Sequence, residues 1–90
     1  MTYTTALIFA TLLHNQQATI NTDSKFAYIE RNPVNAPVIS VLEKRGLAEI
    51  LPDGTTVVKP KKIEETFQNP NVIDSEILSS IKQGPGTTSW

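Results

Sequence analysis

Residues 35–59 read NAPVISVLEKRGLAEILPDGTTVVK, in which a helix-like segment precedes two short apolar runs separated by a turn. If Asn35 caps the helix, Pro37 falls in its first turn, where the backbone nitrogen needs no partner within the helix. Gly46 suits the left-handed conformation that often follows the end of a helix. The stretch therefore predicts a helix over residues 36–45.

The second half of the stretch predicts a β-hairpin. Pro52 presets the dihedral angle of the turn, Asp53 favours the bend, and Gly54 accepts a positive φ. The flanking residues, 47–51 and 55–59, are short and rich in apolar and β-branched side chains. We expect them to form the two strands.

Two further elements are predicted upstream. Residues 4–16 carry apolar side chains at helical spacing, in a stripe wider than one contact face requires. This first helix is expected to be buried on two sides, either at the centre of the domain or in a dimer interface. Residues 18–22 predict a short strand, and residues 22–30 a second helix that Pro33 stops, because the residue before a proline avoids the helical region.

Two helices are predicted downstream. Pro60 closes the second hairpin strand, and residues 61–68 then predict a short helix. Asn71 is expected to cap a final helix over residues 72–82. Residues 84–90 have the composition of a disordered tail.

The length and composition indicate one domain. Ninety residues supply one modest core, so we assign residues 1–83 to a single domain. The absence of Cys excludes disulfides and suits a reducing compartment, so a cytoplasmic location is expected. The longest apolar run, residues 6–13, is far shorter than the roughly 20 residues of a membrane-spanning helix, and no membrane association is expected.

The predicted order of helix, strand, helix, turn, helix and hairpin resembles the winged helix-turn-helix family over residues 4–60. The segment VISVLEKRGLAE at residues 38–49 is similar to the third helix of that family where it runs into the wing. The resemblance implies an α+β fold, a winged helix-turn-helix with three helices plus a two-stranded wing, followed here by one or two C-terminal helices. The layout also resembles the activation domains of T-even phage middle-promoter activators, in which helices follow the wing.

The resemblance implies a DNA-binding surface, because in this family the third helix usually enters the major groove and the wing approaches the backbone. For the helix at residues 36–45, the resemblance implies that Ser40, Val41 and Lys44 point outward. This face has few of the Arg, Lys, Asn and Gln side chains that read base edges, so we expect phosphate contacts and little direct base readout. The predicted DNA-binding residues are Lys25, Arg31, Ser40, Lys44, Thr55, Thr56, Lys59, Lys61 and Lys62. In the alternative interpretation these are ordinary solvated surface residues.

The charge distribution leaves two functions open. The formal net charge is −1, but residues 1–62 carry seven basic and five acidic side chains, whereas residues 63–90 carry one and four. A DNA-binding transcriptional regulator would therefore use the first two thirds of the chain, as a homodimer in one version of the hypothesis. The alternative is a protein-interaction module that docks on a transcription or replication component. Its expected docking residues are Val41, Ile73, Ile77 and Ile81.

No enzymatic activity is predicted. His14 is the only histidine and there is no Cys, so no nucleophile and base can be assigned from the sequence. The same composition gives no recognisable metal site, and no glycine-rich phosphate loop precedes a predicted helix. We expect no catalytic residues, no metal and no cofactor.

Overall fold

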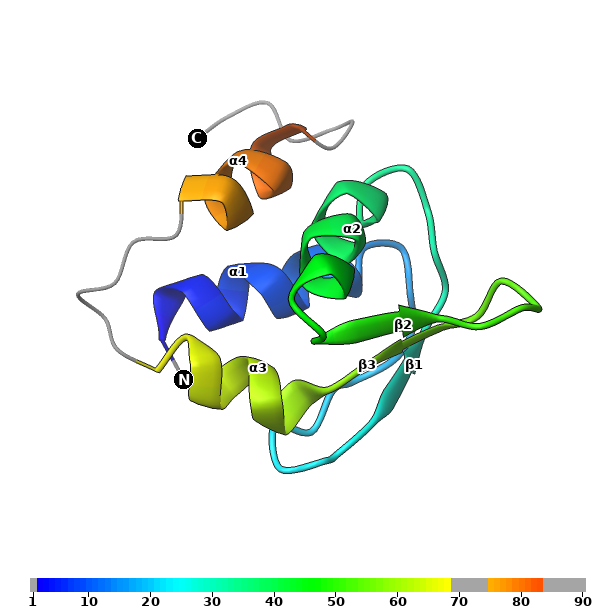
Figure 1. Ribbon diagram of the computed structural model, residues 1–90, viewed down its shortest axis with the longest axis horizontal. Helices are drawn as coiled ribbons and strands as arrows, with labels where there is room; N and C mark the ends of the chain where they lie inside the picture. The colour runs from blue at the N-terminus through cyan, green and yellow to red at the C-terminus, as the bar shows by residue number, and fades with distance from the viewer. Residues whose placement is uncertain (1, 69–74, 84–90) are drawn as a thin grey trace.

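The computed structural model describes residues 2–68 and 75–83. In chain order, the elements are α1 (Tyr3–Leu12), β1 (Ala27–Ile29), α2 (Ala36–Lys44), β2 (Ala48–Ile50), β3 (Thr56–Val58), α3 (Pro60–Thr66) and α4 (Ser75–Gln83) (Figure 1). The strands form one antiparallel sheet in the order β1-β3-β2. The predicted α+β class is confirmed, but the sheet has three strands and not the two of the expected wing.

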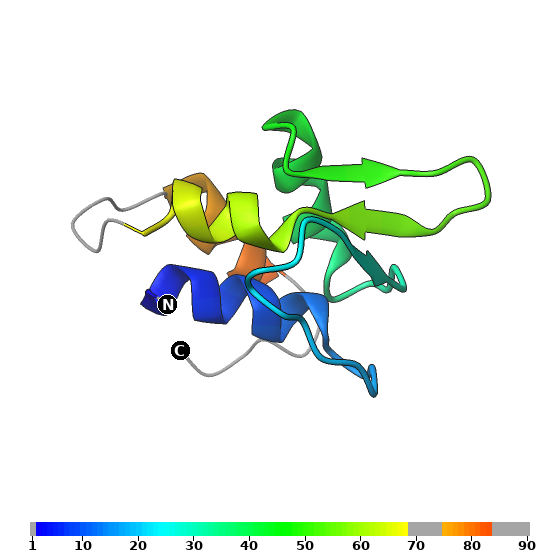
Figure 2. The ribbon, with the colours of Figure 1, turned by 90° about the horizontal axis from the view of Figure 1, so that it is seen from below.

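The core lies where the helices meet each other and one face of the sheet. α4 packs on both α1 and α2, and α2 packs on β2 (Figure 1). The tip of the β2–β3 hairpin extends away from the helices in both views (Figures 1 and 2). The largest fully buried apolar side chains are Ile8, Leu12, Ile29, Ile39, Leu42, Leu47, Ile63, Ile77, Ile81, Val38 and Val58. Every element therefore contributes to one apolar cluster.

The predicted helix at residues 22–30 is wrong, because its second half forms β1. Ala27 pairs with Val58 and Ile29 with Thr56 across the sheet. The side chains alternate, with Ile29 buried and Tyr28 exposed, which is the period of a strand and not of a helix. Aromatic and β-branched residues also favour strands, and pairing with β3 satisfies their backbone groups.

The start of the same segment is a turn, and the predicted strand at residues 18–22 is also absent from the described chain. The Asn21 side-chain oxygen accepts a hydrogen bond from the Asp23 amide at 2.8 Å, and the Ser24 amide donates to the Asn21 carbonyl at 3.0 Å. Asn, Asp and Ser favour such turns because their side chains bond nearby backbone groups. The chain between α1 and α2 thus holds a turn and a strand where a helix was expected.

The first helix ends at Leu12 and not at residue 16 as predicted. Asn15 adopts a positive φ of 61°, which takes the chain out of the helix. The Gln16 side chain then bridges two elements, since its amide nitrogen donates to the carbonyls of Leu12 at 2.7 Å and Glu30 at 2.9 Å. Its oxygen accepts from the Glu30 amide at 3.0 Å, so this side chain fixes the end of β1 beside the end of α1.

The predicted boundary of α2 is confirmed to within one residue, and Asn35 occupies the N-cap position as predicted, but its side chain does not cap the helix. The Asn35 side chain is completely buried and makes no capping hydrogen bond to α2. It donates to the carbonyls of Leu12 at 3.0 Å and Glu30 at 2.9 Å, and accepts from the Asn32 amide at 2.8 Å. Asn35 therefore joins the end of α1, the end of β1 and the start of α2.

The hairpin prediction is confirmed. The Gly54 amide donates to the Leu51 carbonyl at 2.9 Å, and the Leu51 amide donates to the Thr55 carbonyl at 2.8 Å. Gly54 has a φ of +93°, a conformation that L side chains rarely adopt. The Thr55 backbone amide and hydroxyl bond the Asp53 carboxylate and lower the pKa of that group. The loop is therefore a three-residue turn closed by glycine, as the Pro-Asp-Gly sequence predicts.

Both helices predicted after the hairpin are present, as α3 and α4. The predicted cap Asn71, the start of the final helix at residue 72, and the tail at residues 84–90 lie outside the described residues. Within residues 2–68 and 75–83, no helix has the length and apolar character needed to cross a membrane.

Candidate nucleic-acid interface

Four of the predicted DNA-binding lysines lie together, although they come from separate segments. Lys25 precedes β1, Lys59 follows β3, and Lys61 and Lys62 belong to the first turn of α3. A backbone hydrogen bond of 3.1 Å from the Lys61 amide to the Ser24 carbonyl holds the two segments side by side. We call Lys25, Lys59, Lys61 and Lys62 the lysine cluster.

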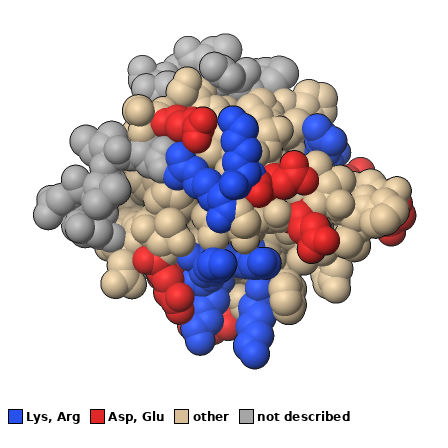
Figure 3. Space-filling view, viewed as in Figure 1, with Lys and Arg blue, Asp and Glu red and all other residues tan. Residues whose placement is uncertain are grey.

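The lysine cluster surrounds a shallow surface hollow of about 380 Å³, whose other lining residues are Phe26 and Glu65. Lys25, Lys61 and Lys62 are exposed, and Lys59 is partly exposed. Figure 3 shows Lys and Arg side chains gathered in two groups on this face, one over the end of α2 and one over the start of α3. The hollow is thus a basic surface on a chain whose net charge is −1.

The position of these lysines is unfavourable for the helix that carries two of them. α3 has no acidic residue in its first turn, and its first residues follow Lys59 as Pro60, Lys61 and Lys62. Cations near a helix N-terminus oppose the helix dipole, and each such contact is worth roughly 0.3–1 kcal/mol. In the part of the chain that the structure describes, no ion pair compensates any member of the lysine cluster. The position of these lysines therefore does not stabilise α3.

An exposed aromatic side chain lines the same hollow as the lysine cluster. Because β1 and β3 are antiparallel and Ala27 pairs with Val58, Phe26 lies beside Lys59. Phe26 is 58% exposed, and Tyr28, two residues further along β1, is 70% exposed. Ala27 and Ile29 point to the core instead, so β1 presents its aromatic residues on the outer face of the sheet.

Two other predicted DNA-binding residues lie together at the far end of β1. Arg31 and Thr55 line a second hollow. Its lining also includes Tyr28 and the turn residues Asp53 and Gly54. This hollow has one cation, Arg31, and two carboxylates, Glu30 and Asp53. It is therefore less basic than the lysine cluster.

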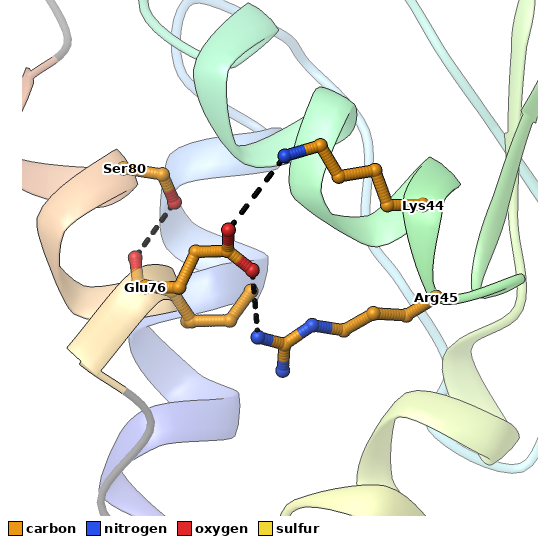
Figure 4. Close-up of polar contacts among 5 residues, drawn as sticks. Lys44, Arg45, Glu76 and Ser80 are labelled. Atoms are coloured by element: carbon orange, nitrogen blue, oxygen red, sulfur yellow. Dashed lines mark hydrogen bonds and ion pairs between the residues drawn. The ribbon is translucent and has the colours of Figure 1, made fainter.

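The remaining predicted cation, Lys44, is engaged by an acidic side chain from α4. Its Nζ lies 3.6 Å from Glu76 Oε2, and Arg45 Nη2 donates to Glu76 Oε1 at 2.9 Å (Figure 4). The Arg45 and Lys44 side chains together lower the pKa of Glu76. Ser40 is exposed on the same helix, but Glu43 and Glu76 place negative charge near the end of α2. α2 consequently offers little that would attract phosphate or read a base.

We expect Glu76→Gln to lower the melting temperature slightly at pH 7 and to have no effect in acid. A carboxylate with a lowered pKa stabilises the fold above its ordinary pKa of 4.5, and this contribution is lost as the pH falls through the lowered value. Circular dichroism melts of the variant and the native chain at about pH 7 and about pH 2 test this. Glu49→Gln, at an exposed position of β2, serves as the matched control. A melting difference that persists in acid would contradict the ion-pair explanation.

The prediction that Thr56 contacts DNA is wrong, because this side chain is completely buried. Thr56 lies in the central strand β3 and pairs with Ile29 on one side and Ile50 on the other. Alternation in the strand turns it to the core and leaves its neighbour Thr55 near the surface. Among the described residues, its hydroxyl has no hydrogen-bond partner.

We expect Thr56→Val to raise the free energy of unfolding by about 1–2 kcal/mol, because it replaces a buried unsatisfied hydroxyl with a methyl group of similar shape. Urea denaturation followed by circular dichroism measures the change. Val58→Thr is the converse control on the same strand, where Val58 is also fully buried. It should lower the stability by about 1–3 kcal/mol. Loss of stability in Thr56→Val would show that the hydroxyl has a partner after all.

The predicted protein-docking residues do not form a surface. Val41, which the sequence analysis turned outward, is buried, and so are Ile77 and Ile81. The reason is that α4 packs on α2 and α1, so both apolar stripes are used inside the domain. Ile73 lies outside the described residues.

Four residues near these sites were missed by the sequence analysis. Phe26 and Tyr28 were missed because they were assigned to a helix, although the aromatic and β-branched residues Phe26, Tyr28 and Ile29 also favour a strand. Arg45 and Glu76 were missed because their contact joins positions 31 residues apart, which no local spacing predicts.

Among residues 2–68 and 75–83, no three His, Cys, Asp or Glu side chains gather in a group that could hold a metal ion. Comparisons of the chain with protein-family models, curated proteins and solved structures found no match.

Proposed function

We propose that this chain is a small DNA-binding domain that regulates transcription and holds DNA mainly through phosphate contacts from the lysine cluster. The observation that carries the proposal is the convergence of four lysines from two segments on one hollow, with one glutamate at its margin. A concentrated basic surface is what phosphate neutralisation requires. Its uncompensated position at the start of α3 supports a role other than stabilising the fold.

The arrangement of elements supports a winged-helix-like mode with one departure. α2 leads directly into the β2–β3 hairpin, and β1 pairs with the second hairpin strand. No helix lies between α1 and α2 in the described chain, so the helix-turn-helix unit is not proposed. Because Lys44 is paired with Glu76, DNA would be held by the lysine cluster, with Arg31 and Thr55 at the hairpin as additional contacts.

Salt-dependent binding tests this function. Fluorescence anisotropy with a labelled random duplex should detect binding at about 50 mM salt, and four phosphate contacts predict a roughly 100-fold loss of affinity at about 200 mM. The measured molar mass of the chain, alone and with DNA, distinguishes a monomer from the homodimer that the sequence analysis left open. Absence of binding at low salt, or binding indifferent to salt, would refute the proposal.

The alternative of a protein-interaction module loses the residues on which it was based. Val41, Ile77 and Ile81 are already covered by neighbouring helices. The exposed large apolar side chains of the described chain are Tyr3, Phe26 and Tyr28, and two of these lie on β1 or directly before it. We therefore develop only the DNA-binding proposal.

A further inference from the structure

We infer that the lysine cluster binds DNA as a single strand, with an unpaired base stacked on the ring of Phe26. The inference rests on the proposed DNA-binding function and adds that the bound DNA is single-stranded. It is carried by the exposed aromatic ring that lines the basic hollow.

The first step concerns what can cover Phe26. More than half of this side chain is exposed, although Phe is among the residues most often buried. Its neighbours in the hollow are four lysines and one glutamate, so an apolar protein surface placed here would have to desolvate several charges. A nucleotide matches both features, because its base has a flat π face and its phosphate is an anion.

The second step separates a single strand from a duplex. In a duplex, the faces of the bases are stacked on one another, and a protein reaches only their edges through the grooves. An exposed ring reaches those faces only by unstacking a base step and kinking the duplex, which costs a few kcal/mol. In a single strand the faces are free, and stacking on aromatic side chains beside a basic track is the usual mode of binding.

The third step gives the direction of the strand along the protein. Tyr28 follows Phe26 on the same outer face of β1. It lines the second hollow together with Arg31 and the acidic side chains of Glu30 and Asp53. A strand anchored at the lysine cluster can therefore continue along β1 as far as Tyr28, whose ring is available for a second base, and the Glu30 and Asp53 carboxylates disfavour phosphates beyond it. Glu49 lies on β2, on the other side of β3, and so away from this path.

Three labelled probes test the inference: a single strand of about twelve thymidines, an abasic strand with the same number of phosphates, and a duplex of the same length. The native chain should bind the thymidine strand more tightly than both other probes at the same salt concentration. Phe26→Leu, which removes the ring but no charge, should weaken binding to the thymidine strand by about 5- to 150-fold. It should leave the salt dependence and the affinity for the abasic strand unchanged.

Matched controls keep the outcomes distinct. Tyr3→Leu removes an aromatic ring that is also exposed, from α1, and should change nothing, and Phe26→Tyr should retain binding. Equal affinity of the native chain for the thymidine strand, the abasic strand and the duplex overturns base stacking but leaves the proposed function intact. A dimer that Phe26→Leu dissociates also overturns the inference, because a second copy would then cover this face. Failure to bind any probe at low salt refutes the proposed function itself.

Discussion

Asn35→Asp is expected to destabilise the fold by about 3–5 kcal/mol at pH 7, more than any other single substitution considered for this chain. The native amide donates to the carbonyls of Leu12 and Glu30 from a completely buried position. A carboxylate has nearly the same shape but no donor, so it would face two carbonyl oxygens with an uncompensated negative charge. The free energy of unfolding from urea denaturation measures the effect.

The same variant should become more stable in acid. Burial beside two carbonyl oxygens raises the pKa of the introduced carboxyl above its ordinary value of about 3.9. The part of the penalty that comes from the negative charge is therefore absent below that value and develops as the pH rises toward the raised pKa, whereas the loss of one donor remains at every pH. Asn21→Asp is the matched control, because Asn21 is exposed and uses its side-chain oxygen as an acceptor, which Asp preserves. An Asn35→Asp variant within about 1 kcal/mol of the native chain would show that Asn35 does not organise this junction.

The triple variant Lys25→Gln, Lys61→Gln, Lys62→Gln is expected to weaken duplex binding roughly 100-fold at low salt. Each lost phosphate contact should also reduce the slope of log affinity against log salt by about 1. Anisotropy titrations at several salt concentrations measure both quantities. The slope is the more specific readout, because it counts the charges that are lost.

Unfolding cannot explain that expected loss. Removing Lys61 and Lys62 relieves an unfavourable contact with the helix dipole of α3, so the melting temperature should stay the same or rise slightly. Lys44→Gln is the matched control, since Lys44 is paired with Glu76 and lies outside the lysine cluster. A triple variant that retains the native slope would show that DNA does not bind at α3. A Lys44→Gln variant that loses as much affinity as the triple variant would show the same.

The elements that the sequence predicts well are those whose signals are local. The hairpin depends on three adjacent residues, Pro52, Asp53 and Gly54, whose backbone preferences set the turn without help from the rest of the chain. The start of α2 depends on the position of Pro37, which also acts locally. These parts agree with the structure because no distant contact competes with them.

The elements that the sequence does not predict are those that depend on distant partners. The sequence of the segment that ends in Ala27–Ile29 is compatible with a helix, but pairing with β3 makes it a strand. Asn35 looks like a cap in sequence, whereas its partners at Leu12 and Glu30 become visible only in the fold. Likewise, the lysines were predicted one by one, and their convergence around Phe26 follows from the tertiary arrangement.

The strand order β1-β3-β2 also bears on how the outer face of the sheet is assembled. The paired residues of β2 and β3 are 6 to 10 positions apart, whereas those of β1 and β3 are 27 to 31 positions apart. Closing the longer loop costs about 1 kcal/mol more chain entropy, so we expect β1 to pair with β3 after the hairpin has formed. Phe26 directly precedes this late-forming strand. A ligand stacked on the Phe26 ring would therefore also stabilise the pairing of β1 with β3. Ligand binding and the pairing of this strand are then thermodynamically linked.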